Sequence, residues 1–284
     1  MKVMNSAAEL RGDLDGRRRS GQRVALVPTM GALHQGHLSL VSLARQHADC
    51  IVMSVFVNPT QFNSLRDLEV YPRELEEDAA KAAGAGVDLL FAPSEDEMYP
   101  SAAGARTSVR AGRVAGGLCG AARPGHFDGV VTVVAMLFNI VGPDIAVFGE
   151  KDYQQLKVIE ALVRDLHYPV TIVAAPLVRE CDGLAMSSRN TLLGAEERRR
   201  ALALSRSLFA ARDSVRGGQR DASAVAGGVR AMLEDECLRV DYVQVVHPET
   251  LEPLNVIEGE AQLMAAVFAG EVRLIDNVRL PGPC

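Results

Sequence analysis

The sequence lacks the cysteine patterns of disulfide-bonded, zinc-binding and redox-active proteins. Its 284 residues include only five cysteines, at the scattered positions 50, 119, 181, 237 and 284. The number is odd, and no two of them form a C-x-x-C pair. This usage fits a reducing compartment, and we expect the protein to work in the cytoplasm.

An excess of basic charge and a long apolar run are also missing. The formal net charge is −6, so no broad basic face for nucleic acid is expected, and an anionic substrate must meet a locally basic pocket. The most apolar stretch, residues 130–141, is interrupted by Thr132 and Asn139 and falls short of the roughly 20 residues that a bilayer span needs. No apolar run with a cleavage site follows Arg17–Arg19, so the N-terminus does not indicate a secretory signal. We therefore expect neither a nucleic-acid nor a membrane partner.

Strand and helix patterns alternate through the first two thirds of the chain. Residues 23–27 form a β-rich run, residues 37–48 carry apolar side chains at helical spacing, and residues 50–57 form a near-continuous apolar run, as in a strand buried in a parallel sheet. The alternation continues with helices expected at 74–83, 130–141 and 153–166, and with strands expected at 87–91, 144–148 and 170–174. It predicts an α/β fold with a doubly wound, parallel, Rossmann-like sheet.

The pattern changes after about Pro176. Two helical segments are expected at 195–215 and 222–238, and alternating runs that predict strands follow at 240–246, 261–268 and 272–276. Helices followed by strands are typical of a small α+β domain. We therefore expect two domains, residues 1–176 and residues 177–284.

A first candidate site is PTMGALHQGH, residues 28–37, where a predicted strand ends and a predicted helix begins. Ligands bind at this edge of open α/β sheets. Gly31 and Gly36 permit close approach of the backbone, and two imidazoles, His34 and His37, beside the N–H groups of a helix start suit a polyphosphate. The alternative is that the histidines cap the helix or bind a structural metal, although no further zinc ligand is obvious nearby.

Two later segments have a similar setting. In GEKDYQQ, residues 149–155, Lys151 is placed to reach phosphate oxygens, and Gln155 lies one helical turn further on. In MSSRN, residues 186–190, two hydroxyls and a guanidinium gather donors for phosphate at the expected domain junction. Taken alone, each segment has a simpler interpretation: a solvated helix start capped by Asp152, and a polar linker.

Several long motifs, in order, resemble the pantothenate synthetase (pantoate–β-alanine ligase) family of the nucleotidyltransferase superfamily. They are PTMGALHQGH at 28–37, VFVNPTQF at 55–62, YPR at 71–73, RPGHFDGV at 123–130, FGEKDYQQL at 148–156 and RECDGLAMSSRN at 179–190. The segment between two of them, NSLRDLEV at 63–70, departs from the family pattern, which leaves the contacts of that loop open.

The resemblance implies an AMP-forming ligase that converts ATP, pantoate and β-alanine into pantothenate through a pantoyl adenylate. It also implies Mg²⁺, a homodimer, and a C-terminal domain, 177–284, that closes over the ATP site. The implied catalytic residues are His34, His37, Lys151 and Arg189. The implied ATP-binding residues are Met30, His37, Gly149, Lys151, Asp152, Val178, Met186, Ser187, Ser188 and Arg189. Those implied for pantoate are Pro28, Met30, Asn58, Gln61 and Gln155, and Asp78 resembles an acidic position associated with the metal.

Arg123 and His126 belong to the matching motif beside the pantoate residues, without an assigned contact. No covalent intermediate with the protein is expected, because charge cancellation and positioning suffice for phosphoryl chemistry. Two rival functions remain: a nucleotidyltransferase that stops at a nucleotide-linked product, and a non-catalytic nucleotide sensor.

Overall fold

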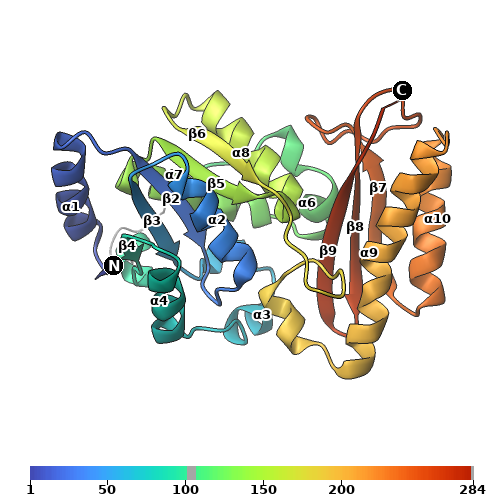
Figure 1. Cartoon of the computed structure of the whole chain (residues 1–284), viewed down its shortest axis with the longest axis horizontal. Coiled ribbons are helices and arrows are strands. Elements are labelled where there is room, and N and C mark those ends of the chain that lie inside the picture. The colour runs from blue at the N-terminus through green and yellow to red at the C-terminus, as the bar shows by residue number, and fades with distance from the viewer. Residues whose placement is uncertain (101–106, 283–284) are drawn as a thin grey trace. The chain divides into compact units, whose positions relative to one another are not determined.

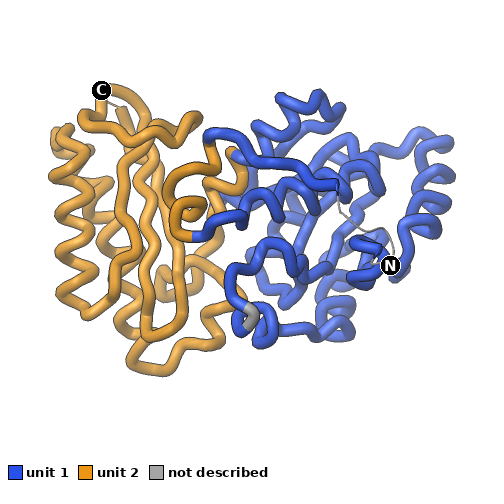
Figure 2. The backbone as a smooth tube through the Cα atoms, turned by 180° about the vertical axis from the view of Figure 1, so that it is seen from behind, with its two compact units in different colours: residues 1–113, 123–150, 158–176 blue, residues 114–122, 151–157, 177–284 orange. Residues whose placement is uncertain are grey.

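The computed structural model describes residues 1–100 and 107–282, and the chain divides into two compact units (Figure 2). The first unit comprises residues 1–113, 123–150 and 158–176. The second comprises residues 114–122, 151–157 and 177–284. Two short segments from the first two thirds of the chain therefore belong to the same unit as the C-terminal residues.

A six-stranded parallel sheet is the centre of the first unit, with the strand order β1-β4-β3-β2-β5-β6 (Figure 1). The strands are β1 (Lys2–Met4), β2 (Val24–Thr29), β3 (Cys50–Val55), β4 (Leu89–Phe91), β5 (Ile145–Gly149) and β6 (Thr171–Ala175). The predicted parallel sheet is confirmed. The buried apolar runs of β2 and β3 explain its centre, since both faces of these strands are covered.

Helices lie on both faces of this sheet. Helices α2 (Gln35–Arg45) and α4 (Leu75–Gly84) pack with β2, β3 and β5 in one apolar cluster. Helix α7 (His126–Val141) contacts β2 and α1 (Ala7–Arg19), and nearly all of α7 is buried, as its composition predicts. The shorter helices are α3 (Leu65–Glu69) and α5 (Glu95–Met98), and α8 (Tyr153–Asp165) follows β5.

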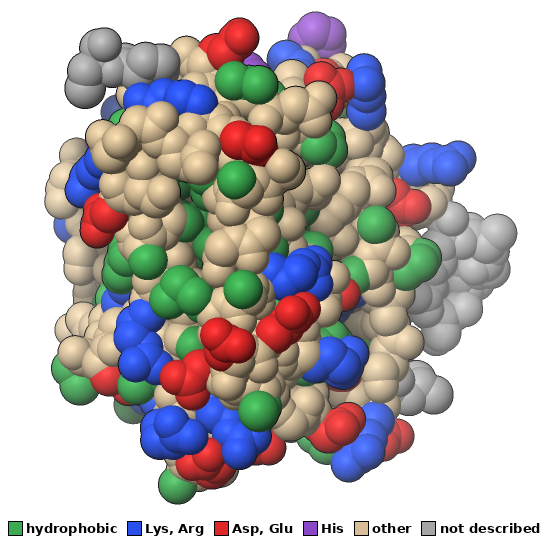
Figure 3. All heavy atoms as spheres, turned by 90° about the vertical axis from the view of Figure 1, so that its right-hand side faces the viewer, with side chains coloured by type: hydrophobic (Ala, Val, Ile, Leu, Met, Phe, Trp, Pro, Cys, Tyr) green, Lys and Arg blue, Asp and Glu red, His purple; other side chains and the backbone are tan. Residues whose placement is uncertain are grey.

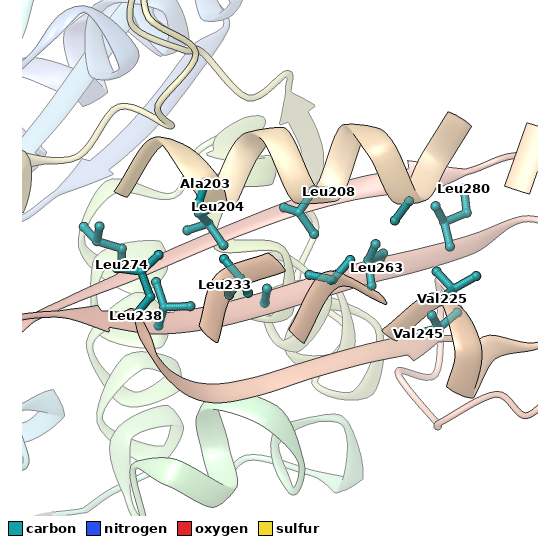
Figure 4. Close-up of a cluster of buried hydrophobic side chains, with 14 of the residues drawn as sticks. Ala203, Leu204, Leu208, Val225, Leu233, Leu238, Val245, Leu263, Leu274 and Leu280 are labelled. Atoms are coloured by element: carbon teal, nitrogen blue, oxygen red, sulfur yellow. The ribbon is translucent and has the colours of Figure 1, made fainter. Parts of the chain in front are cut away.

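The second unit has a three-stranded antiparallel sheet covered by two helices. The strands β7 (Arg239–Val246), β8 (Ala261–Ala269) and β9 (Val272–Leu280) pair in chain order, and α9 (Ala195–Arg216) and α10 (Ala222–Asp235) bury their apolar faces on the sheet (Figure 4). The predicted α+β character of this part is confirmed. Side chains on the opposite face of the sheet, such as Tyr242 and Met264, pack with Leu118 of the short helix α6 (Leu118–Ala122) and with Tyr153.

The outer surfaces of α9 and α10 carry charges of both signs. Arg199 and Arg200 pair with Glu196 at 2.8 and 2.9 Å, and Arg230 pairs with Glu234 at 3.5 Å. Figure 3 shows acidic and basic side chains interspersed over the side of the protein that it presents. Exposed pairs of this kind contribute little stability each, so the apolar face toward the sheet holds these helices in place. Among the described helices, none is both long and apolar enough to span a bilayer.

Candidate active site

The turn between β2 and α2 is built around the carboxylate of Asp78. Gly31 and Ala32 both have positive φ, +84° and +50°, which turns successive backbone N–H groups toward one point. Asp78 of α4 occupies that point, because its oxygens accept the N–H groups of Ala32 and Leu33 at 2.8 and 2.7 Å. A side chain at Gly31 would meet Asp78 Oδ2 at 2.8 Å, so this position needs glycine.

The same helix also holds the carbonyl side of this turn. Lys81, one turn after Asp78 on α4, donates to the carbonyl of Leu33 at 2.9 Å and pairs with Glu77 at 2.7 Å. Two backbone N–H groups of the motif 28–37, those of Ala32 and Leu33, are therefore bonded to a protein side chain. Asp78 and Lys81 thus hold both the N–H side and the carbonyl side of this turn.

His34 and His37 lie together at that helix start. Their rings stack at 4.0 Å between centroids with an interplanar angle of 24°, and both side chains are half-buried. The backbone N–H of His34 donates to Nδ1 of His37 at 3.3 Å. Because Nδ1 accepts, the neutral His37 ring carries its proton on Nε2, so this nitrogen is a donor. The predicted strand–turn–helix setting of the motif is confirmed, with His34 as the N-cap of α2.

Met30, Asn58 and Gln61 meet beside the same edge of the sheet. Asn58 is the N-cap and Gln61 the last residue of the short helical turn η1 (Pro59–Gln61), and Asn58 Nδ2 donates to Gln61 Oε1 at 2.9 Å. Asn58 also donates to the carbonyl of Gly129 on α7 at 3.1 Å, and Gln61 Nε2 donates to Met30 Sδ at 3.1 Å. Pro28 lies in β2, two residues before Met30. The structure thus brings four of the five predicted pantoate residues into one region of the first unit.

Three further side chains hold this cluster. Tyr99 donates its hydroxyl to Asn58 Oδ1 at 2.8 Å, a contact that sequence reasoning missed. His126 Nδ1 and Arg123 Nη2 both lie within hydrogen-bond distance of the Gln61 carbonyl, at 2.8 and 3.1 Å. Since a carbonyl only accepts, His126 carries its proton on Nδ1 and receives Arg123 Nη1 on Nε2 at 3.2 Å. Arg123 and His126 therefore set the backbone of Gln61.

The fifth predicted pantoate residue, Gln155, belongs to the second unit. It lies in the first turn of α8, after Gly149 ends β5 and residues Glu150–Asp152 form the turn η4. In this turn, Lys151 Nζ lies 3.5 Å from Asp152 Oδ2, and both side chains are half-buried. The predicted sequence of strand, turn and helix around Lys151 is confirmed, whereas Asp152 lies within the turn.

The neighbour of Gln155 fixes this segment within the second unit. The side chain of Gln154 is 2% exposed, and Oε1 accepts the N–H of Cys119 at 3.0 Å. Its Nε2 donates to the carbonyls of Val114 and Gly117 at 3.0 and 2.8 Å. All three contacts lie in the segment 114–122, which explains why this segment and residues 151–157 fall in one unit. No local pattern in the sequence indicates this pairing, because the partners are between 35 and 40 residues apart.

The remaining predicted ATP residues lie on a small hairpin in the second unit. Val178 accepts the N–H of Met186 at 3.0 Å, and Arg179 pairs with Ala185 as an antiparallel bridge. The hairpin leads into the turn η5 (Ser188–Leu192), whose N-cap is Ser187: its hydroxyl accepts the N–H of Arg189 at 3.3 Å. The following side chains are all half-buried: Val178, Met186, Ser187, Ser188 and Arg189.

Ion pairs fix the base of this hairpin to α9. Arg198 binds Glu180 at 2.7 Å and Asp182 at 2.5 Å. Its hydrogen bonds hold the pKa values of both carboxyl groups below their usual range, although burial opposes the shift. Asn190 bonds Glu180 at 2.5 Å and the carbonyl of Ala185 at 3.0 Å, which closes the turn back on the hairpin.

The predicted metal residue, Asp78, does not fit as a ligand for Mg²⁺. It is 2% exposed, and both of its oxygens already accept backbone N–H groups. Within residues 1–100 and 107–282, no group of three or more His, Cys, Asp or Glu side chains is placed to hold a metal ion. Mg²⁺ prefers octahedral oxygen coordination and usually keeps several waters. A buried carboxylate committed to a turn does not offer that geometry.

Comparison with known proteins adds independent information. A family model described as pantoate-beta-alanine ligase matches residues 2–279. Pantothenate synthetase of Thermoanaerobacter sp. (strain X514) is 50% identical over 279 residues, which cover 98% of this chain and 98% of the relative. Pantothenate synthetase of Myxococcus xanthus (strain DK1622) is 52% identical over 283 residues, 99% of this chain and 96% of the relative.

Solved structures agree with these relatives. The crystal structure of pantothenate synthetase from Thermus thermophilus superposes with a TM-score of 0.92 at 47% identity, covering 98% of this chain and 99% of that one. The pantoate-beta-alanine ligase from Francisella tularensis, complexed with beta-gamma ATP and beta-alanine, superposes with a TM-score of 0.81 at 33% identity. The match covers 98% of this chain and 97% of that one.

Proposed function

This chain belongs to the pantoate-β-alanine ligase family, and we propose that it condenses pantoate with β-alanine to pantothenate in an ATP-dependent reaction. The structural observation that carries the proposal is at the carboxyl edge of the first sheet. There the histidine pair follows β2, and the amide pair Asn58–Gln61 follows β3. One neighbouring pair of strands thus ends in groups suited to phosphate and in groups suited to a hydroxy acid.

The reaction has two half-reactions. The pantoate carboxylate attacks the α-phosphorus of ATP, a bond to oxygen forms, and pyrophosphate leaves with the electron pair of the broken bond. The amine of β-alanine then attacks the acyl carbon of the pantoyl adenylate, AMP leaves, and the amine loses a proton. Neither half-reaction needs a covalent bond to the protein. The protein must hold the reactants in line and cancel the charge that develops on the phosphate oxygens.

Four side chains are proposed to meet that charge: His34, His37, Lys151 and Arg189. Nε2 of His37 carries the proton and can donate to an oxyanion. Lys151 and Arg189 supply permanent positive charge. The other residues proposed to bind ATP are Met30, Gly149, Asp152, Val178, Met186, Ser187 and Ser188. We further propose that residues 177–284 close over bound ATP.

Pantoate is proposed to bind Pro28, Met30, Asn58, Gln61 and Gln155. The Gln61 amide is well prepared for this role, because Asn58 and the Arg123–His126 pair fix its oxygen and its backbone. Its Nε2 donates to a thioether sulfur, which is a weak acceptor. A substrate hydroxyl or carboxylate oxygen is a stronger acceptor and would take over this donor, while the Met30 side chain packs against the apolar part of the substrate.

Mg²⁺ is proposed to arrive with the ATP phosphates, where it supplies charge neutralisation. Asp78 has a different role: it positions the turn at residues 31–33. The protein side chains that face the phosphates are then cationic or neutral, which suits a nucleotide that brings its own metal.

To test this proposal, the purified protein is incubated with ATP, Mg²⁺ and pantoate, with and without β-alanine. The release of pyrophosphate and the release of AMP are measured separately. We expect about one equivalent of pyrophosphate per site with pantoate alone, and steady AMP release with pantothenate formation when β-alanine is added. A stable nucleotide-linked product with no amine requirement would favour a nucleotidyltransferase, and ATP binding without pyrophosphate release would favour a sensor. If another acid replaced pantoate, the substrate assignment would fall.

Lys151→Ala tests the central role. Removing one charge-stabilising group typically lowers the rate by about 100- to 1,000-fold, and we expect a loss in this range. Lys157→Ala is the matched control: this lysine follows on helix α8 and binds Glu249 at 2.9 Å. The control should keep nearly the parental rate. A Lys151→Ala protein within a few-fold of the parent would refute the assignment.

We also propose that the protein is a cytoplasmic homodimer. The scattered cysteines support a reducing compartment; of those that the structure describes, Cys50, Cys119, Cys181 and Cys237 form no disulfide. Sedimentation that shows only monomer at working concentration would refute the dimer.

A further inference from the structure

Two neighbouring polar residues interrupt the buried part of β9. Asp276 and Asn277 are 2% and 7% exposed, and the side chain of Asp276 is fully buried. Successive side chains of a strand point to opposite faces of the sheet. Asp276 therefore shares the face of Leu274 and Val278, which pack in the α9–α10 core, and Asn277 shares the opposite face. Burying a charge in an apolar stripe is costly, so this placement calls for a specific reason.

Asp276 holds the base of the hairpin that leads to Ser187–Arg189. Its two oxygens bind both terminal nitrogens of Arg179, at 2.6 and 2.9 Å. Arg179 also donates to the carbonyl of Gly183 at 3.1 Å, and its guanidinium lies 4.7 Å from the ring centre of Phe209 on α9. A bidentate pair fixes a guanidinium in orientation as well as in position. Arg179 pairs with Ala185, so the contact fixes the hairpin two residues before Ser187.

Asn277 holds the turn that carries Lys151. Its Nδ2 donates to the carbonyl oxygen of Lys151 at 3.0 Å. Its Oδ1 accepts Gln262 Nε2 from β8 at 2.6 Å, which orients the amide. The two polar residues are also joined, since the N–H of Asn277 donates to Asp276 Oδ1 at 2.7 Å. One point on β9 thus contacts both phosphate-binding segments of the second unit, one from each face of the sheet.

We propose that Asp276 and Asn277 are positioning residues for adenylate formation, which set the Lys151 turn and the Ser187–Arg189 turn in register with each other. This inference rests on the proposed function, because it assigns the pair a role toward those phosphate contacts. Neither residue touches substrate. Each acts through a cation, Asn277 through Lys151 and Asp276 through the hairpin that carries Arg189.

The geometry separates this role from plain stabilisation. A buried ion pair is often no more stabilising than apolar residues of the same size, so stability alone does not explain Asp276. A partly buried pair on the same sheet offers a comparison: Arg273 binds Asp241 at 2.7 Å, with side chains 19% and 23% exposed. Arg273 contacts Cys119 and the ring of Tyr242, which packs with Tyr153 of α8, whereas Asn277 bonds the carbonyl of Lys151 directly. Removing either set of contacts should lower the stability of the fold, but only loss of the Asp276 and Asn277 contacts should lower kcat.

The experiment compares Asn277→Leu with Asp241→Asn. Asn277→Leu keeps the branched shape and the number of heavy atoms of the side chain and removes the bond to the Lys151 carbonyl. We expect kcat for pyrophosphate release to fall by about 10- to 100-fold, because small misplacements of a catalytic group cost rates of this size. The KM of this variant for pantoate should stay within about two-fold of the parent value. Asp241→Asn should keep the parental kcat even where it lowers the unfolding midpoint as much as Asn277→Leu does.

The same substitution in a Lys151→Ala background identifies the route. If Asn277 acts through Lys151, Asn277→Leu should cost less than about two-fold there, because the group it positions is gone. The second arm uses Asp276→Asn in the parent and in Arg189→Ala, with the same expectation, and it also serves if Asn277→Leu does not fold.

The proposal is overturned if Asn277→Leu costs the same factor with and without Lys151, or if its activity falls only in proportion to the unfolded fraction. It is also overturned if Asp241→Asn lowers kcat equally. A parent protein that gives no pantoate-dependent pyrophosphate release would overturn the proposed function itself. An active parent whose Asn277→Leu and Asp276→Asn variants both keep the parental kcat would overturn only the positioning role.

Discussion

Asp78→Asn separates a support role in the turn from a role in binding metal. The substitution keeps the size of the side chain but replaces one carboxylate oxygen with an NH₂ group. In the structure, Oδ2 accepts the N–H of Ala32 and Oδ1 accepts the N–H of Leu33. Asparagine can accept only one of these N–H groups, so a buried donor then faces another donor.

The expected loss follows from those two bonds. Hydrogen bonds to a charged group contribute about 1.5–3 kcal/mol, and the site is 2% exposed, so water cannot replace the lost acceptor. We therefore expect the unfolding free energy of the first unit to fall by about 1.5–3 kcal/mol. With about 2–4 °C per kcal/mol for a domain of this size class, its melting temperature should fall by about 3–12 °C. The rate should fall too, because His34 and His37 follow the turn directly.

The assay is calorimetry of the nucleotide-free protein, paired with a Mg²⁺ titration of pyrophosphate release. Support of the turn predicts a lower melting temperature and an unchanged Mg²⁺ midpoint. Glu76→Gln is the matched control: it makes the same chemical change on the same helix at an exposed position, and it should shift stability by less than about 0.5 kcal/mol. An unchanged melting temperature together with a Mg²⁺ midpoint raised about ten-fold or more would show that Asp78 is a metal ligand instead.

Two further substitutions test other parts of the structure. Gly129→Ala would bring a Cβ to 2.6 Å from the carbonyl oxygen of Thr60, a backbone contact that cannot yield easily; we expect a loss of about 1–3 kcal/mol and a raised KM for pantoate, measured by calorimetry and steady-state kinetics. Arg198→Gln should remove the part of the pH dependence of stability that comes from Glu180 and Asp182. Since Arg198 lowers the pKa values of Glu180 and Asp182 from 4.5 and 3.8, their stabilisation is present above those values and is lost as the pH falls through the lowered ones. Urea unfolding between about pH 5 and pH 3 should therefore show a flatter decline in the variant than in the parent.

Each of these expectations has a clear contrary outcome. A Gly12→Ala control should be neutral or stabilising, because no atom lies within 4 Å of its new Cβ and helix interiors favour alanine. If Gly129→Ala were equally neutral, the close contact between α7 and the turn at Thr60 would be wrong. If parent and Arg198→Gln lost stability in parallel through the acid range, the carboxylates of Glu180 and Asp182 would not be the groups responsible.

The sequence predicted the elements whose pattern is set by burial. The strands β2, β3 and β5 are continuous apolar runs, and the structure places them at the centre of the sheet. Strand β1 and helix α1 were not predicted. Strand β1 has only three residues and exists because Lys2–Met4 pairs with Leu89–Phe91, a partner that local pattern cannot reveal. Helix α1 has a single narrow stripe, Leu10 and Leu14, in an otherwise charged segment.

The candidate site also has a part that the sequence predicts and a part that it does not. The motifs and their places at strand ends were predictable from the sequence, because strand, turn and helix follow one another directly. The contacts that support them were not. Tyr99 reaches Asn58 across 41 residues, and Asn277 reaches Lys151 across 126. Such contacts depend on the tertiary structure, which brings distant parts of the chain together, and no local sequence pattern indicates them.

The places where the sequence prediction failed have a physical meaning of their own. The expected end of β9 at residue 276 is wrong because Asp276 and Asn277 break the alternation of apolar residues, although the strand continues to Leu280 against β8. A strand that keeps its pairing through a buried carboxylate and a buried amide accepts a desolvation cost at both positions. The structure shows what offsets that cost: the Arg179 guanidinium on one face and the Lys151 carbonyl on the other. The disagreement between pattern and structure therefore marks the point on β9 that contacts both segments of the second unit for which phosphate binding is proposed.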